Sequence, residues 1–338
     1  MDFTKRIGKR KIGDFVDFIK QKSDEIGFRV SSRGWGYILE QAGYITKDQF
    51  NKVEDLINRC RKSGLLPVDF VAEESSRQFS EIHIPSEESY EGHVASWLQA
   101  ALDCEAYYTP DWWKDEEYYV QMVVEKIDLI TLFQPICRQY HIPIANAKGW
   151  SSILQRAEYA RRFKEAEDRG LKCVLLYCGD HDPDGLRISD TILKNLEDVS
   201  QIRWNNGEDG FDPSNLEIVR FGLNYDFIIK NKLTWIDNLI TGNTQKKMDL
   251  GSPTHPNHRL AYVQQYLKKV GRRKCEANSI IVVPDKGKQM CKIAVQEILG
   301  EDALGRFAKR RKEVRKKIVE VMDAVDVREA IEEAIRKL

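Results

Sequence analysis

The sequence predicts an α/β protein in which a parallel-sheet domain follows a helical N-terminal region and precedes a mostly helical C-terminal region. Apolar residues recur at three- and four-residue spacing up to about residue 108. Short β-rich runs then alternate with helical segments, and basic helices close the chain. These three observations predict domains over residues 1–115, 116–235 and 236–338, the last an α+β extension that completes the sheet domain.

The first predicted domain consists mainly of helices. Gly64 and Pro67 interrupt this helical pattern between its third and fourth segments. The segments with helical periodicity are "FVDFIKQK", "GWGYILEQAGYI", "KDQFNKVEDLINRCRKSGLL" and "HVASWLQAALDCEAYY". We therefore expect a small helical domain before the sheet.

The middle of the chain alternates between strands and helices. Predicted helices cover residues 127–140, 151–170 and 185–199, and the strands between them are "YYVQMVVE", "IPIANA", "KCVLLYCG" and "LEIVRFGL". Strands that alternate with helices pair in parallel, because each helix returns the chain to the starting edge of the sheet. The pattern predicts a parallel sheet covered by helices.

Charge and composition narrow the function classes. The 53 basic and 53 acidic side chains cancel, but basic residues cluster in "KRIGKRK", "KKVGRRK" and "RFAKRRKEVRKK", which form either solvated helix faces or a local basic surface. No apolar run of about 18 residues and no signal peptide is present, so a cytoplasmic or, in a eukaryote, nuclear protein without membrane association is expected. Seven cysteines without a C-x-x-C pair predict buried thiols.

The segment "VLLYCGDHDPDG" places three aspartates, Asp180, Asp182 and Asp184, directly after an apolar strand. Glu125 ends an earlier predicted strand in the same way. Because the carboxyl ends of parallel strands meet at one edge of the sheet, Glu125, Asp180 and Asp182 are expected to converge there. Clustered carboxylates repel one another, and a hard divalent cation relieves that repulsion. The sequence therefore predicts a Mg²⁺ site.

These aspartates fit three other interpretations less well. An EF-hand loop requires a glutamate at its twelfth position, which here is Thr191, and a helix before the loop. A haloacid-dehalogenase-type phosphatase carries its D-x-D on the first strand of the sheet, whereas here a strand with Glu125 comes earlier. The third is a turn that caps the helix beginning near Leu186, which does not by itself require acids at all three positions.

The order of these motifs resembles the TOPRIM domain, and "VVEK…IANAKGWSS…VLLYCGDHDPDG" is most similar to the TOPRIM domain of the topoisomerase VI A subunit family, which includes the meiotic double-strand-break protein. The resemblance covers roughly residues 120–225. It implies that Glu125, Asp180 and Asp182 hold Mg²⁺. Lys126 and Lys148 become candidates to face phosphate, or else are ordinary surface lysines.

Members of this family cut DNA with a tyrosine on a winged-helix-like domain, four residues after an arginine. In "RGWGYILEQAGYI", Arg33 and Tyr37 have that spacing and lie on one helical face. The resemblance implies that Tyr37 attacks phosphorus while Arg33 clamps the phosphate. Gly34 and Gly36 depart from the family pattern and are expected to loosen the helix. Tyr37 could also be an ordinary core aromatic residue.

The resemblance implies a magnesium-dependent enzyme that cleaves double-stranded DNA as a homodimer, with the tyrosine of one subunit facing the metal of the other. The chain has no phosphate-binding loop of the ATPase type, so strand passage would need a separate ATPase subunit. Arg272 and Arg273 are expected to contact DNA phosphates. The alternatives are a TOPRIM nuclease that uses metal-activated water and a non-catalytic DNA-binding subunit of a larger complex.

Overall fold

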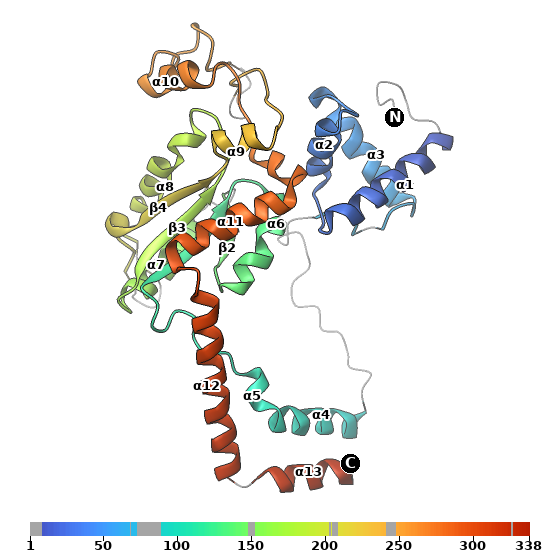
Figure 1. Cartoon of the computed structure of the whole chain (residues 1–338), viewed down its shortest axis with the longest axis vertical. Helices are drawn as coiled ribbons and strands as arrows, with labels where there is room; N and C mark the ends of the chain where they lie inside the picture. The colour runs from blue at the N-terminus through green and yellow to red at the C-terminus, as the bar shows by residue number, and fades with distance from the viewer. Residues whose placement is uncertain are drawn as a thin grey trace. The chain divides into compact units, whose positions relative to one another are not determined.

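The computed structural model describes residues 9–67, 69–72, 89–147, 153–202, 204, 209–240, 248–325 and 327–338 (Figure 1). The chain divides into two compact units. The first comprises Met1–Glu74 and Glu117–Ile298, and the second comprises Ser75–Glu116 and Leu299–Leu338. The three-domain division drawn from the sequence stays a prediction.

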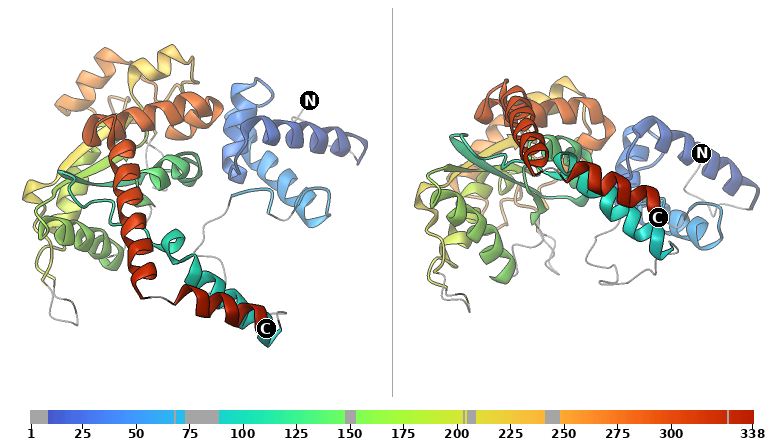
Figure 2. Two further views of the ribbon diagram at one scale, coloured as in Figure 1. Left: turned by 60° about the horizontal axis from the view of Figure 1, so that its bottom comes forward. Right: turned by 90° about the horizontal axis from the view of Figure 1, so that it is seen from below.

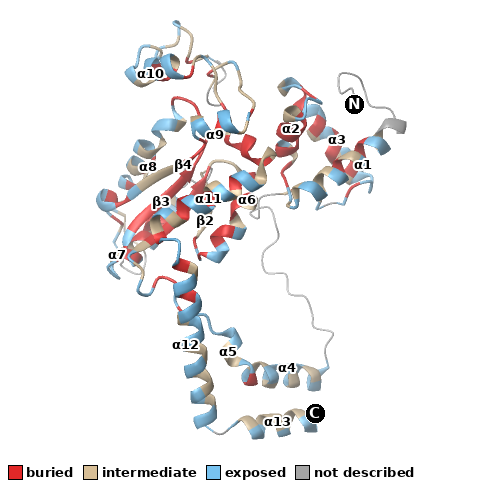
Figure 3. Cartoon of the chain, in the orientation of Figure 1, coloured by how far each residue is buried: buried red, intermediate tan, exposed pale blue. Residues whose placement is uncertain are grey.

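A four-stranded, all-parallel sheet forms the centre of the first unit, which confirms the α/β class. The strand order is β2-β1-β3-β4. Valine, leucine and tyrosine side chains make the two central strands almost completely buried, as a sheet covered on both faces requires (Figure 3). The strands are β1 (Tyr118–Val124), β2 (Ile144–Asn146), β3 (Lys172–Cys178) and β4 (Glu217–Gly222).

Helices connect the strands and pack against them. Each of the predicted helices between strands is present: α6 (Ile127–Gln139), α7 (Ile153–Glu167) and α8 (Ile188–Glu197). A later helix, α11 (Pro284–Leu299), lies against α6, because Gly287 faces the side chain of Leu132. The remaining helices of this part are α9 (Tyr225–Lys230) and α10 (Ala261–Lys269).

The N-terminal segment is helical, as predicted. Its helices are α1 (Lys9–Ile26), α2 (Ser32–Gln41) and α3 (Phe50–Lys62). They enclose a hydrophobic core that includes Phe15, Trp35, Leu39, Phe50 and Ile57, all at most 1% exposed. This core also receives Ile281 from the distant 3₁₀ helix η6 (Ala277–Val282), so the helical segment and the later part of the first unit are packed together.

A buried carboxylate fixes α2 against the sheet side of the first unit. Asp128, at the start of α6, accepts hydrogen bonds from the backbone N of Ser31 (2.5 Å) and from its Oγ (2.8 Å). It also accepts one from Asn278 Nδ2 (2.9 Å) in η6. Ser31 is the N-cap of α2, and its Oγ accepts from Gly34 N. One buried acid therefore joins three distant segments at the beginning of the tyrosine-bearing helix.

The second unit is helical in its described residues. Its helices are α4 (Tyr90–Leu102), α5 (Cys104–Tyr107), α12 (Ala303–Ala324) and α13 (Arg328–Lys337). Figure 2 shows α13 alongside α4, and the rings of Trp112 and Phe307 pack together where α12 begins. Leu102 is the one residue of α4 that is buried. Across the described ranges, no helix is both long and apolar enough to span a bilayer.

The seven cysteines all lie among the described residues and are free thiols, six of them buried. Burial raises the pKa of Cys275 to about 12 and also raises that of Cys60. Protonated, shielded thiols are poor nucleophiles and poor metal ligands. This arrangement agrees with the buried thiols expected from the sequence.

Candidate functional site

The acids predicted at the ends of β1 and β3 meet in the structure. Asp180 N donates a hydrogen bond to Glu125 Oε2 at 2.8 Å, which fixes the two strand ends to each other. The ammonium of Lys126 lies 2.8 Å from Glu125 Oε1 and 3.1 Å from Asp180 Oδ2. The structure thus brings Glu125, Lys126 and Asp180 together through the parallel pairing of β1 with β3.

Asp182 shapes the loop that follows β3. Its Oδ1 accepts a hydrogen bond of 2.6 Å from Gly185 N, and its side chain is buried. A Cβ atom at Gly185 would lie 2.4 Å from the carbonyl oxygen of Asp180, so the loop closes tightly only because this residue is glycine. Asp180 Oδ1 accepts a further bond of 2.7 Å from Ala277 N. The turn-forming role considered for the D-x-D-P-D-G segment is therefore present alongside the acid cluster.

The donor chemistry of this cluster suits a hard cation. Glu125, Asp180 and Asp182 offer carboxylate oxygens, the ligands that Mg²⁺ prefers, and Lys126 already places a positive charge between two of them. Among the residues that the structure describes, no group of three or more His, Cys, Asp or Glu side chains is arranged as a metal site. Lys126 neutralises Glu125 and Asp180, and Asp182 bonds within its own loop. These contacts account for the way the three carboxylates are arranged.

Burial and charge shift the protonation of these groups in opposite directions. Burial raises the pKa of Asp180 to about 7, although Lys126 acts against it. Burial alone would also raise the pKa of Glu125, but Lys126 and the Asp180 backbone N–H lower it below its usual value. The pKa of Lys126, which burial would lower, is raised by the two carboxylates. Asp180 is therefore the acid whose charge is most costly without a further cation.

The predicted nucleophile lies beside this cluster in the same chain. Tyr37 is 5% exposed, and its hydroxyl donates a hydrogen bond to Glu276 Oε2. Glu276 Oε1 lies 2.5 Å from Lys47 Nζ, and the Lys47 ammonium also sits 5.4 Å from the centre of the Tyr37 ring. Burial, reinforced by the negative charge of Glu276, raises the pKa of Tyr37 well above its usual value. Tyr37 is a neutral hydrogen-bond donor in this state.

Glu276 is held as a carboxylate. Burial alone would raise its pKa, but Lys47 lowers it to about 2, with Tyr37 and Lys126 acting in the same direction. A carboxylate with so low a pKa is a weak general base at neutral pH. Its geometry instead orients the Tyr37 hydroxyl.

Arg33 lies one turn before Tyr37 and is half exposed. Its Nη1 bonds Glu54 Oε1 at 3.0 Å and Asn51 Oδ1 at 3.3 Å, and its guanidinium stacks 5.1 Å from the centre of the Phe50 ring. These contacts with α3 leave a fork that is oriented but still accessible, as binding of an anion requires.

The two glycines that were expected to loosen α2 are needed for its packing. A Cβ atom at Gly36 would lie 2.6 Å from the Phe50 ring, and one at Gly34 would lie 2.8 Å from Asp128 Oδ2. The helix is continuous from Ser32 to Gln41. Close approach to α3 and to Asp128 therefore explains the departure from bulkier helix formers.

A pocket of about 1070 Å³ joins the acid cluster to the tyrosine helix. Tyr37 reaches this pocket through its bond to Glu276. Tyr177 of β3 also lines it and lies 3.4 Å from Glu125 Oε2 through its hydroxyl. The charged lining residues are Arg33, Lys47, Glu125, Lys126, Asp180, Asp182, Asp184, Lys274 and Glu276. The site thus combines carboxylates and cations in a polar cavity.

The remaining predicted phosphate contacts do not line this pocket or fall outside the described residues. Arg272 pairs with Asp249 at 2.8 Å, and the guanidinium of Arg273 stacks 4.3 Å from the centre of the Trp235 ring. Lys148 belongs to the range 148–152, which lies outside the described residues. The basic residue of that region that does line the pocket is Lys274.

Sequence reasoning missed several residues of the site. Lys47 and Tyr177 carry no motif that could have marked them, and Lys274 ends the basic run "KKVGRRK", from which only Arg272 and Arg273 were singled out. Glu276 had a weak signal, because "KCEANSII" faintly resembles the same family, but no residue was assigned from it. Its role depends on a contact with Tyr37 across 239 positions of sequence, which no local pattern encodes.

Comparison with known proteins finds no matching family model, no matching curated protein and no solved structure of significant similarity. The site is therefore interpreted from its own residues.

Proposed function

We propose that this chain is a magnesium-dependent DNA-cleaving protein of the TOPRIM class, resembling the topoisomerase VI A subunit, and that Tyr37 forms a covalent link to a DNA end. The finer architecture, a TOPRIM domain with a winged-helix-like tyrosine domain, belongs to this proposal. The observation that carries it is the hydrogen bond from Tyr37 to Glu276, on the wall of the pocket that also holds Glu125, Asp180 and Asp182.

Each residue has a role that its position supports. Arg33, Lys47 and Lys274 would bind the phosphate that enters the pocket, and Glu276 would orient the Tyr37 hydroxyl. The Tyr37 oxygen would bond to phosphorus as the bond from phosphorus to a sugar oxygen breaks, and the proton lost by the phenol would pass to that oxygen, which leaves as a hydroxyl. Glu125, Asp180 and Asp182 would hold Mg²⁺, which would stabilise negative charge on the phosphate oxygens when bound.

The proposal includes double-stranded DNA as substrate and a homodimer as the assembly. Because Tyr37 bonds Glu276, which lines the same pocket of one chain as Asp180, each subunit would carry its own complete site rather than share it. Arg272 and Arg273 would meet DNA phosphate outside the pocket. Strand passage would still require a separate ATPase subunit.

A second candidate function is a TOPRIM nuclease in which metal-activated water replaces the tyrosine. One observation favours it: Tyr37 is buried, and burial with Glu276 raises its pKa. A neutral phenol that is buried and bonded to Glu276 is a poor nucleophile. Water in the same polar pocket does not have to be released from such a contact before it attacks. A non-catalytic DNA-binding subunit is the third possibility.

The proposal is tested with supercoiled plasmid DNA incubated with purified protein in Mg²⁺ or EDTA. We expect nicked or linear products with Mg²⁺, and a large loss of cleavage in Glu125→Gln. Asp190→Asn is the matched control, because Asp190 is an exposed acid on α8 that pairs with Arg187 outside the pocket. Full cleavage in EDTA, or an unaffected Glu125→Gln, would overturn the metal-dependent function.

A further inference from the structure

Arg220 is a half-buried cation beside the acid loop, residues 179–185. It lies on β4, the strand next to β3, and uses its guanidinium almost entirely for hydrogen bonds to backbone oxygens. Its Nη2 donates to the carbonyls of Asp180 (2.9 Å), Gly179 (3.2 Å) and Leu223 (2.9 Å). Its Nε donates to the carbonyl of Gly185 at 3.2 Å.

These acceptors lie at both ends of the acid loop. Gly179 and Asp180 open it, and Gly185 closes it, so one planar group ties its entrance and exit to β4. The loop between them carries Asp182, whose Oδ1 is bonded to Gly185 N. Arg220 thus bonds the Asp180 backbone directly and reaches Asp182 through Gly185, so a change in its position would shift both ends of the loop.

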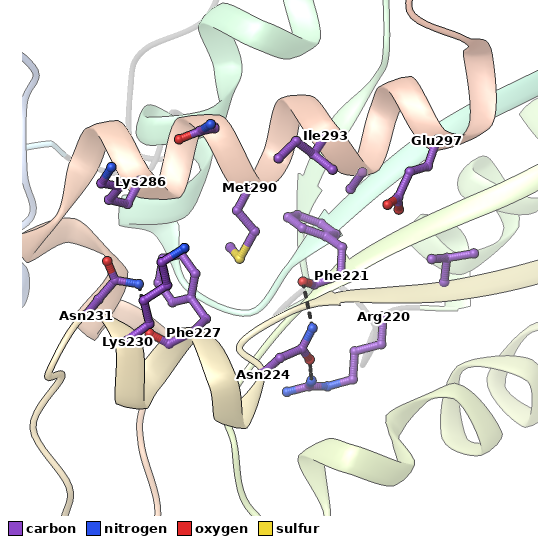
Figure 4. A pocket seen from close by; sticks show the side chains of 13 residues that line it. Arg220, Phe221, Asn224, Phe227, Lys230, Asn231, Lys286, Met290, Ile293 and Glu297 are labelled. Carbon is purple, nitrogen blue, oxygen red and sulfur yellow. Dashed lines mark hydrogen bonds between the residues drawn. The ribbon is translucent and has the colours of Figure 1, made fainter.

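A neighbouring amide fixes the plane of the guanidinium. Asn224 Oδ1 accepts from Arg220 Nη1 at 2.8 Å, and Asn224 Nδ2 donates to the Phe221 carbonyl at 3.2 Å, as the dashed lines in Figure 4 show. This pair stands at one side of a second pocket, of about 440 Å³, whose lining includes Met290 and Phe227. Asn224 therefore holds one side of the Arg220 guanidinium, while the other donors of Arg220 face the acid loop.

We propose that Arg220 is a positioning residue for the acid site, setting the backbone of Asp180 and Asp182 in the geometry that receives Mg²⁺; this inference rests on the proposed function. A guanidinium presents five donors in a rigid fork, so it can reach Gly179, Asp180 and Gly185 at once. A lysine has three donors on a flexible stem and cannot span the same acceptors.

The test uses the full chain and the variants Arg220→Lys and Arg220→Ala. Arg187→Ala is the matched control, because Arg187 is a half-exposed arginine two residues beyond the same loop that pairs with Asp190. Mg²⁺ affinity is measured by calorimetry, cleavage as a function of Mg²⁺ concentration, and folding by thermal denaturation. We expect about 10- to 100-fold weaker Mg²⁺ binding in Arg220→Lys, as for other residues that orient metal ligands, and wild-type affinity in Arg187→Ala.

Chemical rescue tests whether the guanidinium group itself, rather than the volume of the side chain, sets the Mg²⁺ affinity. We expect millimolar methylguanidinium to restore part of the Mg²⁺ affinity of Arg220→Ala without restoring that of Arg187→Ala or Glu125→Gln. If Arg220→Ala fails to fold, Arg220→Lys carries the test alone, and wild-type Mg²⁺ affinity in Arg220→Lys overturns the inference. Wild-type protein that binds Mg²⁺ but does not cleave DNA would overturn the proposed function and leave this inference standing. Wild-type protein that does not bind Mg²⁺ would overturn both.

Discussion

The acid loop at the end of β3 and the tyrosine helix α2 face the same pocket but are positioned in different ways. The loop is held by two neighbours from its own sheet, Glu125 directly after β1 and Arg220 on β4, and by one distant bond from Ala277 N to Asp180 Oδ1. Helix α2 is held by Asp128 and Glu276, which lie 97 and 239 positions away in sequence. The loop thus depends mainly on contacts with neighbouring strands, whereas the place of Tyr37 depends on contacts with distant segments.

The difference predicts that the two regions respond to different changes. Substitutions in the sheet should alter the acids, and substitutions at the docking contacts should alter the tyrosine while leaving metal binding intact. In both regions a lysine neutralises a carboxylate: Lys126 beside Asp180, and Lys47 beside Glu276. The function proposed above requires both.

The largest expected effect comes from mixing two inactive variants. Tyr37→Phe and Asp180→Asn should each reduce DNA cleavage by at least about 1000-fold, because one removes the nucleophile and the other a metal ligand. Since Tyr37 bonds Glu276, which lines the same pocket of one chain as Asp180, a mixture with demonstrated subunit exchange should remain inactive. Recovery of cleavage in the mixture would show instead that the tyrosine of one subunit serves the acids of the other.

The next largest expected effect is a pH dependence of the free energy of unfolding, which arises from His181 in the acid loop. Burial lowers the pKa of His181 to about 4, and Arg220 and Lys269 act in the same direction. The folded state therefore binds fewer protons than the unfolded state, so stability present above pH 6.5 is lost as pH falls toward 4. The full shift is worth about 3 kcal/mol.

This contribution can be isolated by substitution. The raised pKa of Asp180 acts in the opposite direction, because its ionisation on going from pH 4 to pH 7 costs folded stability. His181→Phe should therefore lose less free energy of unfolding than wild type between pH 7.5 and pH 5, measured by urea denaturation. Parallel pH profiles for the two proteins would refute the assignment.

A smaller effect is expected at the cap of the tyrosine helix. Ser31→Ala removes the cap bond to Gly34 N and leaves one oxygen of the buried Asp128 without the Ser31 hydroxyl, so the free energy of unfolding should fall by about 2 kcal/mol. Ser89→Ala is the control, since Ser89 caps α4 through Gly92 N in an exposed setting and should cost about 0.5–1 kcal/mol. Equal losses in urea denaturation would argue against the docking role of Asp128. DNA cleavage should fall more than Mg²⁺ affinity in Ser31→Ala.

The smallest expected effect distinguishes two helical glycines. Gly36→Ala should destabilise the protein by about 1 kcal/mol or more, because the new methyl group would meet the Phe50 ring. Gly13→Ala in α1 should be stabilising by up to about 1 kcal/mol, because nothing lies within 4 Å of its Cβ position and alanine favours a helix. Thermal denaturation of the two variants checks both signs. A stabilising Gly36→Ala would indicate that α2 is not packed against α3 as described.

Much of the fold could be predicted from the sequence because it is locally encoded. The alternation of β-rich and helical segments predicted β1 to β4 and their parallel pairing, since each strand is followed by a helix long enough for a crossover. The amphipathic spacing predicted α1, α2 and α3 in the same way. The extra 3₁₀ helix η6, which completes both the helical core and the pocket, has no comparable periodic signal.

The site residues that lie at strand ends could be predicted from the sequence, and the residues that depend on other contacts could not. Glu125 and Asp180 could be placed together because strand ends meet at one sheet edge. The bond between Tyr37 and Glu276 could not, since it depends on the docking of α2 through Asp128 and on the path of the chain after α10. The place of Lys47 beside Glu276 likewise follows from tertiary packing, whereas Arg220 reaches the acid loop from the neighbouring strand β4.

We propose Tyr37, rather than water or another tyrosine, as the nucleophile that attacks DNA at this pocket. The most direct measurement is covalent trapping: protein, end-labelled duplex DNA and Mg²⁺ are mixed, denatured in detergent, and resolved so that labelled protein is visible. We predict label on wild-type protein and on Tyr177→Phe, which alters the other pocket tyrosine, and none on Tyr37→Phe. If Tyr37→Phe still cleaves DNA and no label stays on the wild-type protein, Tyr37 is not the nucleophile. That result would favour the water-dependent nuclease.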